Sequence, residues 1–81
     1  MMTKKQMKET IKTQYMAAVY EAKTARNAYM QAINDGVEGL RKLSFRDDYV
    51  GKIQYEKSIA DMILLLKLAN IEELQEWENM V

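Results

Sequence analysis

The sequence predicts an all-α protein in which a long N-terminal helix, an antiparallel second helix and a short C-terminal helix form a helical hairpin or three-helix bundle. Two of the observations behind this prediction concern composition. Proline is absent and glycine occurs only three times in 81 residues, and these two residues are the ones that most destabilise helix interiors. The third observation is spacing: apolar residues recur at the three- and four-residue intervals of helices that pack lengthwise on one another.

The first helix is expected over residues 3–35. Between Tyr15 and Ala32 its apolar positions follow a heptad rhythm, and most of them are alanine. Small side chains allow a neighbouring helix to approach closely. Gly36 is expected to end the helix, because glycine readily adopts the left-handed conformation of a helix C-terminus.

The remainder of the single domain contains a connector and two further helices. The connector is expected over residues 36–44, the second helix over 45–69 and the third over 71–79. Asn70, followed three residues later by Glu73, matches the pattern of a capping box. Folding the chain as a hairpin brings the glutamate-rich third helix beside the lysine-rich start of the first helix, where their charges are complementary.

The composition excludes several classes of function. The 12 basic and 12 acidic residues give zero net charge, so bulk charge does not attract the chain to nucleic acid or to an anionic membrane. Without histidine or cysteine there is no ordinary general base, thiol nucleophile or zinc site. We therefore expect no enzymatic activity, no cofactor and no metal.

The expected location is cytoplasmic, with no association with a membrane. The N-terminal segment lacks the apolar core of a signal peptide. The longest strongly apolar run covers residues 62–66, and this is far shorter than a membrane-spanning helix.

Self-association into a homodimer is expected to complete the bundle. A chain of 81 residues without cysteine is near the lower limit of what one core can stabilise. Apolar residues cover about half of the first helix, more than one neighbouring helix can bury. The candidate interface comprises Tyr15, Ala18, Ala22, Ala25, Tyr29, Leu65, Leu68 and Trp77.

Trp77, the single tryptophan, fits two interpretations equally well. It can anchor the core by closing one end of the bundle. It can also be the centre of an interface with another protein, because tryptophan and tyrosine dominate the binding energy of such interfaces.

Four charged residues interrupt the apolar stripes of the two long helices: Lys23, Arg26, Lys52 and Glu56. The favoured interpretation is an ion-pair cluster that sets the register of the hairpin, since charges inside bundles commonly specify pairing. The alternative is a pocket of cations and tyrosines that binds a phosphate or a nucleotide.

The expected function is that of a small protein-binding module, an adaptor, inhibitor or regulatory protein of phage or mobile-element type. Its helical surface is rich in tyrosine and methionine, which suit adaptable binding surfaces. One alternative is an anionic-ligand or nucleotide binder that uses the lysine, arginine and tyrosine pocket. A second is a nucleic-acid-binding accessory protein that uses Lys4, Lys5, Lys8 and Lys12, although nucleic acid is an unlikely partner for a neutral chain.

Overall fold

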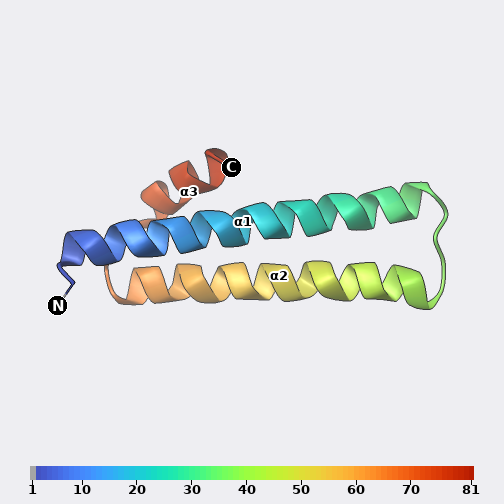
Figure 1. The fold of residues 1–81 in the computed structure, drawn as a ribbon, viewed down its shortest axis with the longest axis horizontal. Helices are drawn as coiled ribbons and strands as arrows, with labels where there is room; N and C mark the ends of the chain where they lie inside the picture. Colours follow the sequence, from blue (N-terminus) through green and yellow to red (C-terminus); the bar gives the residue numbers. More distant parts are fainter. Residues whose placement is uncertain (1) are drawn as a thin grey trace.

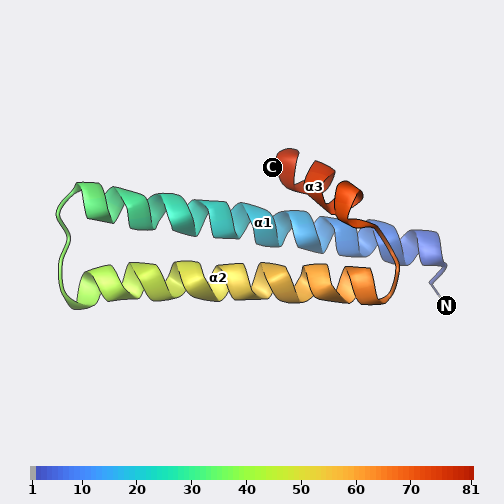
Figure 2. The same ribbon diagram turned by 180° about the vertical axis from the view of Figure 1, so that it is seen from behind.

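The computed structural model describes residues 2–81, and over this range it consists of three helices, α1 (Lys4–Asn34), α2 (Leu40–Leu65) and α3 (Ile71–Asn79). The first two helices lie side by side as an antiparallel hairpin, and α3 turns back along the first half of α1 (Figures 1 and 2). The molecule is elongated, with extents of 49 × 20 × 18 Å. The all-helical prediction is confirmed for the described residues.

Both ends of α1 follow from local sequence. The hydroxyl of Thr3 accepts a hydrogen bond from the Gln6 amide at 3.1 Å, and the Gln6 side chain accepts one from the Thr3 amide at 2.9 Å. This reciprocal pair satisfies two amides that have no partner within the helix. At the other end Gly36 adopts a φ of 73°, and the Val37 amide donates to the carbonyl of Ala32 at 2.9 Å, which is the Schellman arrangement.

The second helix begins at Leu40 rather than near residue 45, so the connector is shorter than the predicted span of 36–44. Gly39, with a φ of 71°, precedes its first turn. Ser44 therefore lies inside the helix and does not begin it. The physical reason is that leucine, arginine and lysine at 40–43 all favour helix, so nothing delays its start until the serine.

The second helix also ends earlier than predicted, at Leu65 rather than at residue 69. Lys67 takes the left-handed conformation with a φ of 56°, and the Leu68 amide donates to the carbonyl of Ile63 at 3.0 Å. Leu68 and Ala69 are both buried in the core. The turn is stabilised by this burial, which a continuing helix would not provide.

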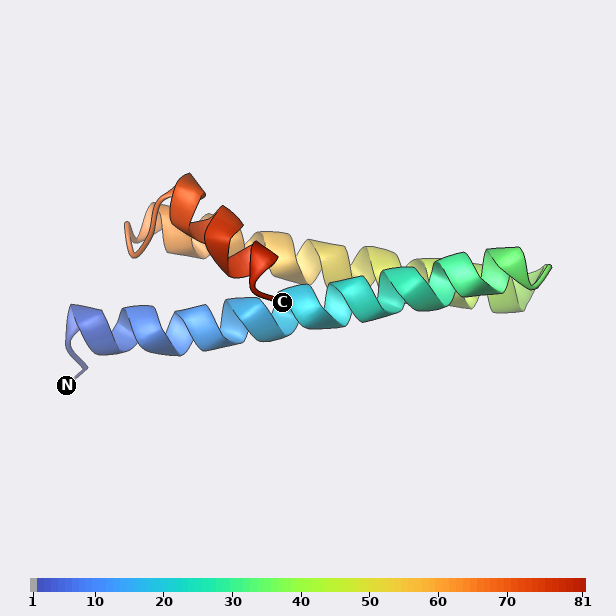
Figure 3. The same ribbon diagram turned by 90° about the horizontal axis from the view of Figure 1, so that it is seen from above.

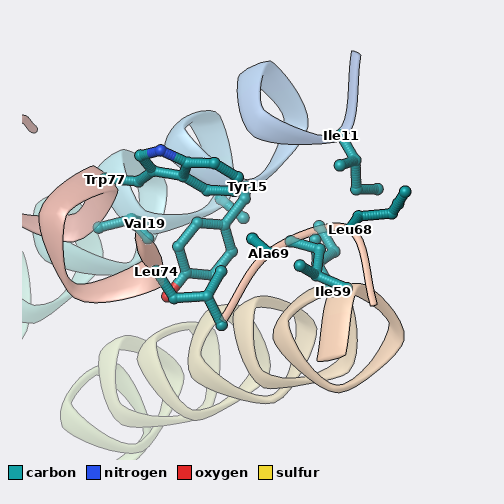
Figure 4. Close-up of a cluster of buried hydrophobic side chains, with 10 residues drawn as sticks. Ile11, Tyr15, Val19, Ile59, Leu68, Ala69, Leu74 and Trp77 are labelled. Atoms are coloured by element: carbon teal, nitrogen blue, oxygen red, sulfur yellow. The ribbon is translucent and has the colours of Figure 1, made fainter. Parts of the chain in front are cut away.

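The core lies at the end of the hairpin where all three helices meet (Figure 4). It contains Ile11, Tyr15, Ala18, Val19, Ile59, Ile63, Leu68, Ala69, Leu74 and Trp77. Away from this end α1 contributes buried alanines, namely Ala22, Ala25 and Ala32. Of the residues of α2, all of which the structure describes, Ile59 and Ile63 are the buried ones. One half of the molecule is thus a three-helix bundle and the other half a hairpin with a thin core.

Among the described residues, none of the helices carries an apolar stretch long enough to cross a membrane.

Replacing Lys67 by glycine is expected to stabilise the protein. A left-handed φ of 56° is unfavourable for a side chain with a Cβ atom and is readily adopted by glycine. We expect the free energy of unfolding of Lys67→Gly to exceed that of Lys67→Ala by about 1 kcal/mol. Urea denaturation of both variants measures this difference, and because both lose the same charge, equal stabilities would contradict the prediction.

Candidate protein-binding groove

The contact of α3 with the hairpin is centred on Trp77, which is 5% exposed. Its ring lies against that of Tyr15, with ring centroids 6.4 Å apart and planes inclined by 58° (Figure 4). The ammonium group of Lys12 lies 5.7 Å from the centroid of the Trp77 ring, within the range of a cation–π contact. The structure thus places Trp77 in the core, the first of its two interpretations.

Lysines of α1 contact the acidic third helix at both of its ends. Lys8 Nζ lies 2.6 Å from a carboxylate oxygen of Glu73, and this hydrogen bond lowers the pKa of the Glu73 carboxyl. At the other end Lys23 Nζ donates to the carbonyls of Glu78 and Val81, each at 2.9 Å. These carbonyls lie in the last turn of α3 and just beyond it, where a cation interacts favourably with the helix dipole.

The residues of the predicted ionic cluster have different surroundings. Lys23 binds the C-terminal carbonyls of α3, whereas Lys52 lies 3.6 Å from a carboxylate oxygen of Glu21. Arg26 is exposed. The hydrogen-bond partners of Lys23 and the ion-pair partner of Lys52 thus lie outside the predicted set, while the charge of Lys23 acts on Glu56 within it.

Glu56, the fourth member of that set, lies beside a second carboxyl group, that of Glu78. Burial raises the pKa of the Glu56 carboxyl, and the charge of Glu78 and a hydrogen bond between the two groups raise it further, while Lys23 opposes the shift. Burial, with the same two carboxylates, also raises the pKa of Tyr15 to about 12. Glu56 is thus a partly buried carboxyl that retains its proton more strongly than an exposed one.

The N-terminal lysines line an open cavity of about 960 Å³ at the end of the molecule opposite the connector between α1 and α2. Lys4, Lys5, Lys8 and Lys67 line it together with Glu72 and Glu73. Because Lys8 is already paired with Glu73, part of this positive charge is neutralised by the chain itself. The arrangement matches the predicted pairing of the first and third helices.

The candidate interface residues are divided between the interior and the surface. Those that are buried within the single chain are Tyr15, Ala18, Ala22, Ala25, Leu68 and Trp77. Tyr29 is half-buried, with its ring centroid 6.2 Å from that of Tyr49. Leu65 is 81% exposed. The alanine seam thus contributes to packing within one chain.

Beyond the end of α3, the two long helices continue side by side without a third helix over the face that α3 covers (Figure 3). On α1, Met30 and Ile33 are 49% and 42% exposed, and on α2, Ile53 is 40% exposed. Ile33 lies two heptads after the buried Val19, and Ile53 lies one heptad before Ala60, which packs against the core. Residues a heptad apart share a helix face, so these exposed side chains extend the surface on which α3 lies.

We call this region the open groove. Its apolar members are Met30, Ile33 and Ile53, and its basic members are Arg26, Lys42 and Arg46. Met30 belongs to a second apolar stripe of the first helix, formed with Met16, Val19 and Val37, which the sequence also shows. The length of α3, which decides how much of the stripe is covered, becomes apparent only from the structure.

Comparison with known protein families, curated proteins and solved structures finds no match to this chain. Within residues 2–81 the structure also contains no group of three or more histidine, cysteine, aspartate or glutamate side chains arranged to hold a metal ion.

The raised pKa of Glu56 makes stability depend on pH. In the folded chain the pKa of this carboxyl is higher than the ordinary value of 4.5. The resulting stabilisation is complete below the ordinary pKa and is lost as the pH rises through the folded pKa. Glu56→Gln removes this loss, so we expect the stability of the variant relative to the wild type to increase between about pH 4 and about pH 8.

Chemical denaturation across this pH range measures the effect. Glu38→Gln is the matched control, because Glu38 is exposed near the hairpin connector. If the difference in the free energy of unfolding between Glu56→Gln and the wild type stayed constant with pH, the raised pKa of Glu56 would be contradicted.

Proposed function

We propose that the protein is a non-enzymatic protein-binding module whose binding surface is the open groove. The observation that supports this proposal is the row of exposed apolar side chains that continues the α3-binding face past the end of α3. Contiguous apolar surface of this kind is typical of sites that bind other macromolecules. Methionine and isoleucine here provide contact area, and the basic residues at the margins provide polar contacts.

The two alternatives have less support from the contacts of the cations. A phosphate or nucleotide pocket needs cations that converge on one point, but Lys23 and Lys52 already have partners on α3 and α1. A nucleic-acid site on the first turns of α1 needs a continuous positive surface, but glutamates of α3 line the same cavity. The role of an adaptor, inhibitor or regulatory subunit requires only a binding surface.

Site-specific photocrosslinking tests this proposal. Benzoylphenylalanine in place of Ile53 lies in the open groove, and in place of Leu40 it lies at the start of the same helix, at a position that is 84% exposed. In cells that naturally produce the protein, we expect a discrete adduct from position 53 and at least tenfold less from position 40. Equal yields from the two positions, or no adduct from position 53, would overturn the proposal.

A homodimer is a second candidate, favoured by the outward surface of α2. Tyr55, Met62 and Leu65 are exposed there, and Leu65 is 81% exposed. Side chains at these positions lie within one helical face and can pack against the same face of a second copy.

Light scattering after gel filtration, over a hundredfold range of concentration, tests self-association. The chain has a mass of 9.5 kDa, and a dimer through α2 gives twice this value. We expect Leu65→Glu to restore the monomer mass, while Leu40→Glu, an equally exposed leucine at the start of α2, leaves the dimer intact. A wild-type chain that stays monomeric throughout would exclude the homodimer.

A further inference from the structure

The third helix shows what kind of segment the hairpin groove binds. Its buried side chains are Leu74 and Trp77, and the remainder of the helix carries glutamates at 72, 73, 76 and 78. Basic residues of α1 contact it at the first turn, at the aromatic ring and at the final carbonyls. In this molecule the groove thus binds a short, acidic, amphipathic helix.

The open groove repeats this chemistry on the same face. Met30, Ile33 and Ile53 provide exposed apolar surface, whereas the corresponding side chains beneath α3, Tyr15 and Val19, are buried. Arg26 lies one heptad after Val19, on the face that α3 covers nearer the N-terminus.

The cations of α2 reach the same side of the groove. Arg46 lies one heptad before Ile53, and Lys42 lies one turn before Arg46. Arg46 is only loosely paired, with 3.9 Å between its Nε and a carboxylate oxygen of Asp47. Together with Arg26, these residues give the open groove a positive margin.

The length of the open groove matches that of the helix already bound. From Arg26 to the end of α1 at Asn34 there are nine residues, the same number as in α3. At a rise of about 1.5 Å per residue this is a helical segment of about 14 Å. A helix of two to three turns therefore fits beyond the C-terminus of α3.

Charge distinguishes between the possible occupants. If two copies of the chain met through their open grooves, Arg26, Lys42 and Arg46 of each would face the same cations of the other, and such like-charge contacts are unfavourable. A helix with glutamates beside its apolar face would pair with these cations instead.

We propose that the open groove binds a short acidic amphipathic helix of a partner protein, which lies against Met30, Ile33 and Ile53 and pairs with Arg26 and Arg46. This inference rests on the proposed function and specifies the class of partner. It extends the interface already formed by α3 with a second helix of the same chemistry.

The probe for this proposal is a fluorescein-labelled peptide with the sequence of residues 70–81, titrated with the full chain. The α3 of the same chain occupies its own site at an effective concentration on the order of millimolar, so it outcompetes the added peptide there. The peptide is therefore expected to bind at the open groove. A second peptide, in which the four glutamates are replaced by lysine, is the control for charge. We expect the acidic peptide to bind at least tenfold more tightly than the lysine peptide, with an affinity that falls as salt is added.

Two variants with the same change of charge on one helix locate the site. Arg46 belongs to the open groove, whereas Arg41 lies one heptad before Asp48, which lines a shallow pocket with Glu21 and Tyr55. We expect Arg46→Glu to weaken binding of the acidic peptide about fivefold and Arg41→Glu to weaken it less than twofold. Amide chemical-shift changes are expected at Met30, Ile33 and Ile53.

Three results would overturn the proposal: equal binding of the two peptides, equal effects of the two variants, or shift changes confined to the contacts of α3. The last of these means that the peptide displaces α3. An adduct from position 53 in cells without binding of the acidic peptide would leave the protein-binding function intact and refute the class of partner. No adduct and no peptide binding would refute both.

Discussion

The rest of the structure depends on the packing of Trp77 against α1. Two antiparallel helices in water bury only the stripe between them, which in α1 consists largely of alanine. Alanine permits close approach but contributes little apolar area. Trp77 and Leu74 from α3 add the large side chains that turn one end of the hairpin into a core, and loss of a buried tryptophan typically costs about 3–5 kcal/mol.

This dependence divides the molecule into unequal halves. The third helix is nine residues long, so it covers only part of a hairpin that extends over 49 Å. Beneath α3 the groove is closed and its cations have partners, and beyond α3 the same face is exposed. The open groove thus results from the difference in length between α3 and the helices on which it packs.

Much of the fold could be predicted from the sequence, because helix propensity and capping depend on neighbouring residues. The order of the three helices, the N-cap at Asn70 and the end of α1 at Gly36 follow from patterns a few residues long. The pairing of Lys8 with the third helix follows from the hairpin arrangement. The end of α2 could not be predicted in this way. The helix stops where it does because Leu68 and Ala69 enter a core that forms only when distant segments meet.

The candidate site was less predictable for the same reason. A charged residue that interrupts an apolar stripe acquires its partner from tertiary structure, so the sequence alone does not show that Lys23 donates to carbonyls at the end of α3. Trp77 likewise satisfies the pattern of a core residue and that of an interface residue. The periodicity identifies apolar faces, but not how far along each face another helix extends.

Lys23 marks the boundary between the two halves. Its ammonium group binds the last carbonyls of α3, and on α1 it precedes Arg26, the first cation of the open groove, by less than one turn. The end of α3 is also where the carboxyl groups of Glu56 and Glu78 lie close together, which raises the pKa of Glu56. A helix bound in the open groove as proposed would meet the end of α3 here, where Lys23 lies near two carboxyl groups. Arg26, Lys42 and Arg46 lie farther along the hairpin, where the acidic side chains of α3 do not reach. The proposed attraction for an acidic partner is therefore greatest beyond the end of α3.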